Sequence, residues 1–169
     1  SIPRNPADHY PGGLYVYSSA TVHISTSTIS GNRAVNRYGG GIYNYGGTLQ
    51  IEFSTIFWTH AHHGGGGLRH GSGGTTVVGS IVAGSTSGGD CYGAVVSQGF
   101  NLAGDLSCQF TEATDKRNTD PQLGFARFNG GVTKNHLPNP GSPAIDAGPA
   151  ACPSPDQRNH KRPKGIACD

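Results

Sequence analysis

The chain has 169 residues, of which 28 are glycine and 11 are proline, and only 13% are charged. This length suits one domain with a real core and is short for two. The formal net charge of +2 is too small to neutralise a nucleic-acid backbone, and no run of 18 apolar residues is present to span a bilayer, so neither partner is expected.

Residues 1–11 precede the regular part of the sequence and are expected to form an N-terminal extension, one that could add a strand to a neighbouring copy. A repeat begins at residue 12. Its first block opens with Gly-Gly at 12–17 and recurs at 40–45 and, more loosely, at 66–70. The apolar positions Leu14, Ile42 and Leu68 are 28 and 26 residues apart (42 minus 14 and 68 minus 42).

Each period of about 27 residues contains three short segments in which apolar and polar residues alternate. Alternation over a few residues is typical of half-buried strands, and a period of this length with three strands is typical of one solenoid coil. Equivalent side chains should therefore stack from coil to coil. The expected interior stacks are Leu14–Ile42–Leu68, Val22–Leu49–Val77 and Ile29–Ile56–Val82.

These features predict an all-β fold, a right-handed parallel β-helix (β-solenoid), as one domain over 1–169. Three coils are clear within 12–104, and a fourth is expected around 94–102. Glycines at strand boundaries suit the corners, because they tolerate positive φ. From 105 onward proline and charge replace the repeat, so 105–169 is expected to be a loop-rich C-terminal capping segment.

The four cysteines fall into two local pairs, Cys91 with Cys108 and Cys152 with Cys168, and neither pair has the spacing of a zinc site. Three disulfide connectivities are possible, and the local one is favoured. Each bond would then close a loop of roughly 15 residues, worth about 3 kcal/mol in the chain-entropy model. Cysteines used in this way indicate an oxidising compartment, so we expect a secreted protein at the cell surface.

Several strings resemble a group of bacterial surface proteins. They are Gly-Gly-Gly-Ile-Tyr-Asn at 39–44, Ser-Thr-Ile-Ser-Gly-Asn at 27–32, Ser-Ile-Val-Ala-Gly at 80–84, and the ordered tail motifs from Asp90-Cys91 through Gly-Ser-Pro-Ala-Ile-Asp-Ala-Gly at 141–148 to Ala-Cys-Asp at 167–169. They resemble the choice-of-anchor Q domain proteins, and the Gly-Gly-Ile motif is similar to repeats of the polymorphic outer-membrane proteins. This resemblance implies an extracellular β-helix with no established catalytic residues.

Aromatic residues suggest a surface for a ligand or partner. Tyr15 and Tyr43 occupy matching positions one period apart, as do Tyr17 and Tyr45, and Trp58 lies beside a later strand. Alternation points Tyr15 and Tyr43 outward, where they would form a stacked ladder. Such a ladder could bind sugar rings or a partner, or could simply stabilise the sheet; stabilisation is the slightly favoured interpretation.

Two further kinds of site are weighed and set aside. His60, His62, His63 and His70 are weak candidates for a metal site, because they sit among glycines without a nearby cysteine or carboxylate; no cofactor is expected. A polysaccharide lyase would need clustered carboxylates, and the repeats hold only Glu52 and Asp90, with Arg69 as the basic residue to test. We therefore expect a protein that is not an enzyme.

The preferred hypothesis is a non-catalytic structural or adhesive module of an extracellular surface or matrix. One alternative is a subunit of an extracellular filament that stacks end to end or by strand donation, since an uncovered solenoid end is a template for another chain. A second alternative is a carbohydrate-binding or lyase-like module. The expected partners are accordingly the protein itself, or surface glycans and proteins.

Overall fold

A computed structural model describes residues 1–168, which contain strands, turns and bends but no helix. No segment of that part of the chain is therefore a helix able to cross a membrane. The strands are β1 (Ile2–Pro3), β2 (Pro6–Ala7), β3 (Leu14–Tyr17), β4 (Thr21–Ser25), β5 (Thr28–Ser30), β6 (Arg33–Ala34), β7 (Ile42–Glu52), β8 (Thr55–Phe57), β9 (His60–Ala61), β10 (Leu68–Val78), β11 (Ile81–Ala83), β12 (Cys91–Tyr92), β13 (Val96–Ser97) and β14 (Leu102–Ala103).

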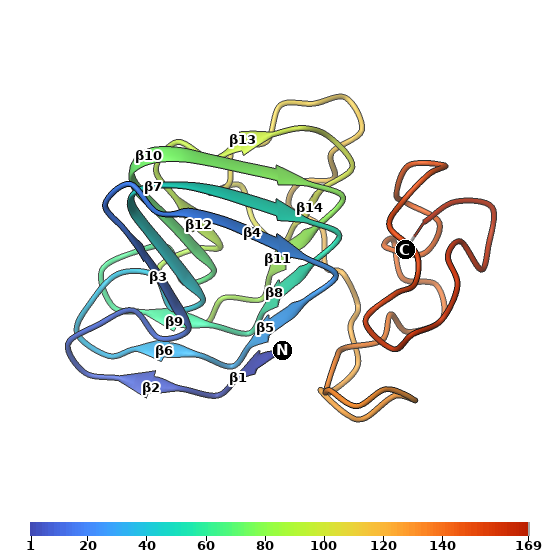
Figure 1. Cartoon of the computed structure of the whole chain (residues 1–169), viewed down its shortest axis with the longest axis horizontal. Coiled ribbons are helices and arrows are strands. Elements are labelled where there is room, and N and C mark those ends of the chain that lie inside the picture. The colour runs from blue at the N-terminus through green and yellow to red at the C-terminus, as the bar shows by residue number, and fades with distance from the viewer. Residues whose placement is uncertain (169) are drawn as a thin grey trace.

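The strands stack into three parallel sheets that wind around one interior, which is the predicted parallel β-helix (Figure 1). The first sheet has the order β1-β5-β8-β11-β14, and the third has the order β2-β6-β9. The second has the order β12-β10-β7-β3, with β4 paired to β7 and β13 paired to β10. β7 and β10 each bend part-way along their length, so each of these long strands forms part of two walls of the solenoid (Figure 1).

The interior is filled by aliphatic side chains that stack from coil to coil, as alternation predicted. Ile42 lies between Leu14 and Leu68 in the parallel register, and Cys91 extends this stack into the fourth coil. The stack of Ile29, Ile56 and Val82 is also confirmed, with Ile2 before it and Ala103 after it. Ile56 and Val82 are fully buried. Two of the three predicted stacks are therefore correct.

The prediction that Val77 stacks on Leu49 is wrong. Thr75 lies beside Leu49, and Val77 lies beside Ile51, because paired residues of β7 and β10 are 26 apart on both sides of the irregularity in β10 (68 minus 42 and 77 minus 51). Between His70 and Gly74 the spacing changes only locally, to 27 where Ser72 pairs with Tyr45, and no net shift remains. A slip of two residues leaves the same side chains facing inward, so alternation alone cannot detect it.

The N-terminal segment forms part of the solenoid of its own chain. β1 pairs with β5 and β2 pairs with β6, both in parallel. Residues 1–11, expected to be an extension, instead supply two strands of the first coil. Donating this segment to a neighbouring copy would first require it to leave these pairings.

One corner of the solenoid carries a polar ladder that the sequence analysis did not identify. In each coil a backbone N–H donates to a side-chain oxygen in the next coil: Ser27 to Ser54, Ser54 to Ser80, and Ser80 to Asn101, at 3.0–3.1 Å. These bonds satisfy buried polar groups and repeat the same corner in successive coils. The residues immediately before them all have positive φ of 44–59°: Thr26, Phe53, Gly79 and Phe100.

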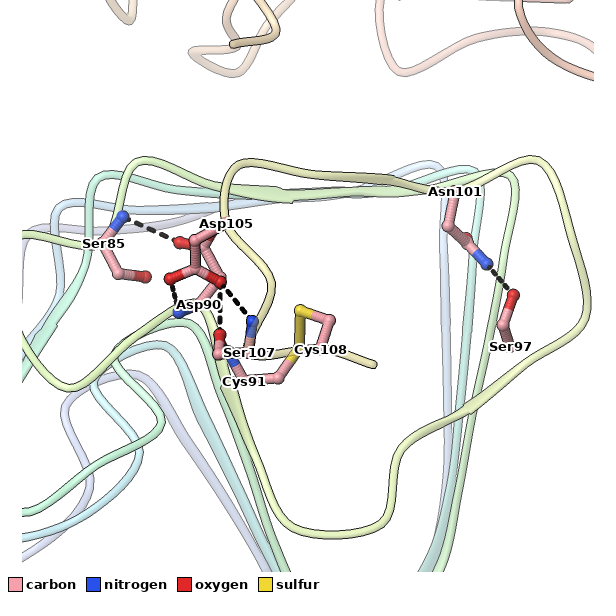
Figure 2. Close-up of a disulfide and its surroundings, with 8 residues drawn as sticks. All are labelled: Ser85, Asp90, Cys91, Ser97, Asn101, Asp105, Ser107 and Cys108. Carbon is pink, nitrogen blue, oxygen red and sulfur yellow. Dashed lines mark hydrogen bonds between the residues drawn. A yellow bond between two sulfur atoms is a disulfide. The ribbon is translucent and has the colours of Figure 1, made fainter. Parts of the chain in front are cut away.

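The first part of the C-terminal cap closes the end of the solenoid. Cys91 and Cys108 form a disulfide with a Cα–Cα distance of 4.6 Å (Figure 2). The buried side chain of Phe110 packs into the hydrophobic core. Asp105 accepts hydrogen bonds from the backbone N–H groups of Asp90 and Ser107. The last coil is thus covered both by apolar side chains and by satisfied polar groups.

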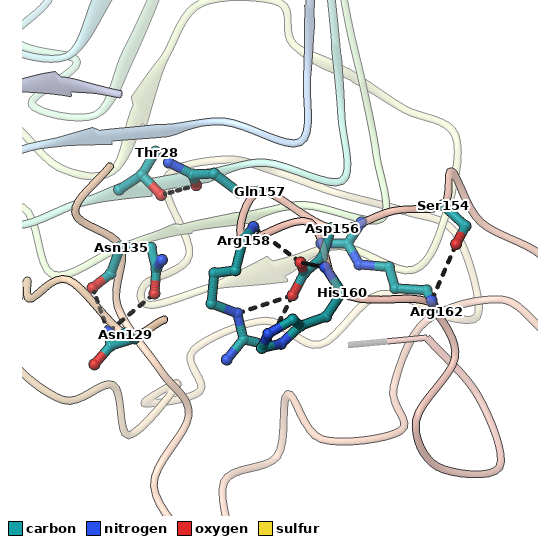
Figure 3. A network of polar contacts seen from close by, with 9 residues as sticks. All are labelled: Thr28, Asn129, Asn135, Ser154, Asp156, Gln157, Arg158, His160 and Arg162. Carbon is teal, nitrogen blue, oxygen red and sulfur yellow. Dashed lines mark hydrogen bonds and ion pairs between the residues drawn. The ribbon is translucent and has the colours of Figure 1, made fainter. Parts of the chain in front are cut away.

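The second part of the cap turns back and lies beside the first sheet (Figure 1). Thr28 Oγ1 donates to Gln157 Oε1 at 2.6 Å, and the ring of His136 lies 4.9 Å from that of Phe57. Figure 3 shows the hydrogen bond between Thr28 and Gln157 beside the polar contacts within the cap. The predicted Cys152–Cys168 disulfide is present, so both local pairings are confirmed.

Candidate ligand or partner surface

Four tyrosines form a compact group on the outer face of the second sheet, which we call the tyrosine array: Tyr15, Tyr17, Tyr43 and Tyr45. The parallel register places Tyr15 beside Tyr43 and Tyr17 beside Tyr45. Ring centroids lie 5.4 Å apart in the first pair and 6.1 Å in the second, while neighbours along each strand lie 5.7–5.8 Å apart. Tyr15 is 39% exposed and Tyr43 is half-buried beside it, so the predicted outward ladder of these two residues is confirmed; Tyr17 and Tyr45 are more exposed, at 61% and 47%.

The row that begins with Tyr15 and Tyr43 continues through Arg69 and Tyr92, which pair in register in the next two coils. The Arg69 guanidinium carbon lies 3.8 Å from the centre of the Tyr92 ring and 4.4 Å from that of Tyr38. We call these three residues the arginine clamp. Stacking of this kind holds a guanidinium group in place through cation–π attraction.

Glycines in the neighbouring coils make room for these rings. A Cβ at Gly71 would lie 3.0 Å from ring atoms of both Tyr43 and Tyr45, and one at Gly64 would lie 2.9 Å from the Tyr92 ring. The rings therefore lie close against bare backbone. This arrangement keeps the array ordered while leaving its outer faces open to solvent.

Tyr15 is uncharged near neutral pH. Burial raises the pKa of Tyr15 above its ordinary value, and the other three array tyrosines add to the shift through charge repulsion. The Tyr15 phenol therefore remains protonated and can donate or accept hydrogen bonds.

The charge of Arg69 has no counter-ion within the described part of the chain. The ion pairs of residues 1–168 join His23 to Glu52 and Arg158 to Asp156, each at 2.7 Å, and neither includes Arg69. Its Nε and Nη1 atoms are enclosed without a hydrogen-bond partner. The guanidinium is thus positioned by two rings and not neutralised by a carboxylate.

Trp58 does not belong to this surface. It lies at the corner after β8 with a φ of 54°, and its ring is covered by the guanidinium of Arg4 at 5.4 Å. The ring contacts of the tyrosines, across residues 1–168, do not include it. Trp58, predicted as part of the candidate surface, is exposed but lies apart from the tyrosines. The chain bends at this corner, which places Trp58 between the first and third sheets.

Two members of the clamp, Tyr38 and Tyr92, were not identified from the sequence. The sequence did contain a signal for Tyr92. Cys91-Tyr92 repeats the pattern of Leu68-Arg69, an inward apolar residue followed by an outward one, and pairs with it in parallel register. Tyr38 lies in a loop before β7, outside any strand alternation. Its position depends on how that loop folds over the sheet.

The four histidines considered for a metal site point in different directions. His70 lies in register with buried Asn44, and its Nδ1 is 3.0 Å from the buried Thr75 hydroxyl. Burial lowers its pKa. His60 contacts Thr86 at 3.2 Å, whereas His62 and His63 are exposed and in edge contact with each other. Across residues 1–168 no three His, Cys, Asp or Glu side chains group as metal ligands.

The three residues considered for lyase chemistry are not joined by any hydrogen bond or ion pair within residues 1–168. Glu52 is paired with His23, and Arg69 is held in the clamp. Asp90 is buried and accepts a hydrogen bond from the Ser85 backbone at 2.9 Å; burial raises its pKa (Figure 2). Each carboxylate thus already has a structural partner.

A second candidate is the cavity of about 310 Å³ between the cap and the first sheet, lined in part by Thr28, Thr55 and Gln157. Its polar groups are largely paired within the protein. Arg158 is neutralised by Asp156, and the Thr28 hydroxyl is bonded to Gln157 (Figure 3). These contacts are those of a packed intramolecular interface, so the tyrosine array remains the better candidate.

Docking of the cap is expected to weaken in acid because of His136. Its Nδ1–H donates to the Gly124 carbonyl and its Nε2 accepts from the Ser30 hydroxyl, both at 2.7 Å, so the neutral ring fits. Burial lowers the pKa of His136 below the ordinary value of 6.5. The unfolded chain therefore takes up the proton first, and stability falls as the pH drops below that ordinary value.

Thermal melting followed at pH 7.5 and at pH 5.5 would measure this effect. His136→Gln, which can both donate and accept, should reduce the loss of melting temperature between the two pH values. The exposed His9 provides a matched control, and His9→Gln should leave the loss unchanged. An unchanged loss in His136→Gln would contradict the assignment.

Comparison of the chain with protein-family models, with curated proteins and with solved structures finds no match. The two disulfides fit an oxidising environment such as the cell exterior. The features that bear on function are therefore the β-solenoid, its disulfides and the exposed array of tyrosines.

Proposed function

We propose that the chain is a non-catalytic extracellular adhesive module that binds its partner through the tyrosine array. The observation that carries this proposal is the grouping of four tyrosine rings, 5.4–6.1 Å apart, on the outer face of a parallel sheet. Tyrosine presents a large apolar ring with a polar tip at a low cost in conformational entropy. A set of such rings on one rigid wall is well suited to recognition.

Three further observations support the proposal. The carboxylates that a lyase would use are occupied in structural contacts. The disulfides suit an extracellular location. The motifs of the repeats and of the tail resemble those of bacterial surface proteins.

Ring-to-ring contacts also stabilise the sheet, by about 0.5–1.5 kcal/mol per pair. Stabilisation alone does not require the rings to be as exposed as Tyr17 is. A residue that serves only the sheet gains by burial, whereas exposed aromatic residues are typical of interaction sites.

The filament alternative is less well supported. End-to-end stacking requires both ends of the solenoid to be open, and the C-terminal end is covered by Phe110 and the Cys91–Cys108 disulfide. The N-terminal segment is already paired within its own chain.

The test is a binding screen with the double variant Tyr17→Ser/Tyr45→Ser against immobilised polysaccharides and extracellular matrix proteins. We expect the double variant to lose at least about tenfold in affinity for whatever the wild type binds, which corresponds to about 1.4 kcal/mol. Phe125→Ser removes an aromatic ring that is 81% exposed on the cap and is the matched control. Equal binding by the wild type and both variants would contradict the proposal.

A further inference from the structure

The tyrosine array and Arg69 form one continuous surface that crosses the coils. Tyr15, Tyr43 and Arg69 occupy one outward row, one residue per coil. Coils in a parallel sheet rise by about 4.8 Å, so Arg69 lies roughly 10 Å along this row from Tyr15. An extended chain lying across the coils would contact the rings first and the guanidinium next.

We propose that the ligand of this surface is an acidic polysaccharide, whose sugar rings pack on the tyrosine array and whose carboxylate binds Arg69. This inference rests on the proposed adhesive function and names its ligand class. It follows from two observations that meet in a single row: exposed aromatic rings and a cation without a counter-ion.

The geometry of the array suits sugars. Most of its ring pairs are tilted by 32–57°, and only Tyr17 and Tyr45 approach a stack, at 18°. The surface therefore combines apolar aromatic rings with phenol hydroxyls. A pyranose has the matching character, with apolar C–H faces and a rim of hydroxyl groups.

The clamp specifies the charge of the ligand. Arg69 is held between the rings of Tyr38 and Tyr92, at 4.4 and 3.8 Å, so little side-chain entropy is left to lose on binding. The ion pairs of the described chain leave its charge uncompensated. Because Nε and Nη1 are enclosed, a carboxylate on the ligand would supply the missing counter-ion through a charge-assisted hydrogen bond to Nη2.

The groups around the clamp are compatible with an anion. His63 lies 5.5 Å from the Tyr38 ring and His62 lies against His63, and both are exposed. The ring contacts of the array and the clamp within residues 1–168 involve tyrosine, histidine and arginine. The exposed imidazole rings beside the clamp can donate hydrogen bonds to an anion.

The experiment compares binding of the whole chain to polygalacturonate and to the same polymer after its carboxyl groups have been reduced to alcohols. The wild type should bind the acidic polymer at least about tenfold more tightly, because only the carboxylate can form a charge-assisted hydrogen bond with Arg69. Arg69→Gln should remove this preference. Lys134→Gln, an exposed charge on the cap, removes the same charge and should keep the preference.

The outcomes separate this inference from the function on which it rests. Equal binding of the acidic and the reduced polymer by the wild type overturns the acidic ligand but leaves tyrosine-dependent adhesion intact. Binding of a matrix protein and of no polysaccharide, lost in Tyr17→Ser/Tyr45→Ser, likewise overturns only the ligand class. Binding that does not depend on the tyrosines overturns the proposed function itself. The polymer comparison uses the wild type, so it holds even if Arg69→Gln fails to fold.

Discussion

Replacing Ile56 with alanine is expected to lower the free energy of unfolding by about 2–5 kcal/mol. Ile56 is fully buried and lies between Ile29 and Val82 in the central stack, so the missing atoms leave a cavity that both neighbouring coils line. Because small proteins are stable by only about 5–15 kcal/mol, such a loss is a large fraction of the total.

Denaturant unfolding measures this loss. Gln50→Ala is the matched control, since Gln50 is exposed on a neighbouring strand, and its effect should stay within about 0.5 kcal/mol. If Ile56→Ala cost less than the control, the stacked interior would not be the main source of stability.

Gly40→Ala is expected to destabilise the chain by about 1–3 kcal/mol or more. A Cβ at this position would collide with the backbone carbonyl oxygens of His60 and Gly66, which cannot rotate away. The reason is steric, because Gly40 is not among the glycines with positive φ. The backbone of the next coil therefore leaves no room for a side chain at Gly40.

Gly74→Ala distinguishes this crowding from a general intolerance of alanine in glycine-rich coils. A Cβ at Gly74 meets no heavy atom within 4 Å, so the same substitution should be neutral or stabilising by up to about 1 kcal/mol. Melting temperatures of the two variants provide the comparison. Similar losses in both would show that the backbones are not as closely packed at Gly40 as their positions indicate.

The proposed binding depends on this same stiffness. The rings of Tyr43 and Tyr45 lie against Gly71 of the next coil, and the coils are held in register by the interior stacks. A surface built on paired strands keeps its rings in place before a ligand arrives, and so little ordering is needed on binding. The disulfide at the end of the core limits fraying of the last coil.

The class of fold and much of the array follow from the amino-acid sequence alone. Side chains that alternate with a period of two, in a repeat of about 27 residues, have few ways to bury their apolar face other than by stacking coils. That argument placed Leu14, Ile42 and Leu68 in one stack, and it placed Tyr15 and Tyr43 beside each other on the outside. Local cysteine spacing likewise predicted both disulfides.

Details that alternation does not encode depend instead on how the folded chain packs. A two-residue slip keeps every side chain on its face, so the pairing of Val77 with Ile51 and not with Leu49 became visible only in the register of β10. Corners and loops have no period, which is why Trp58 turned away from the tyrosines and Tyr38 came to lie on Arg69. Contacts between residues distant in sequence, such as Thr28 with Gln157, depend on the folded path of the whole chain.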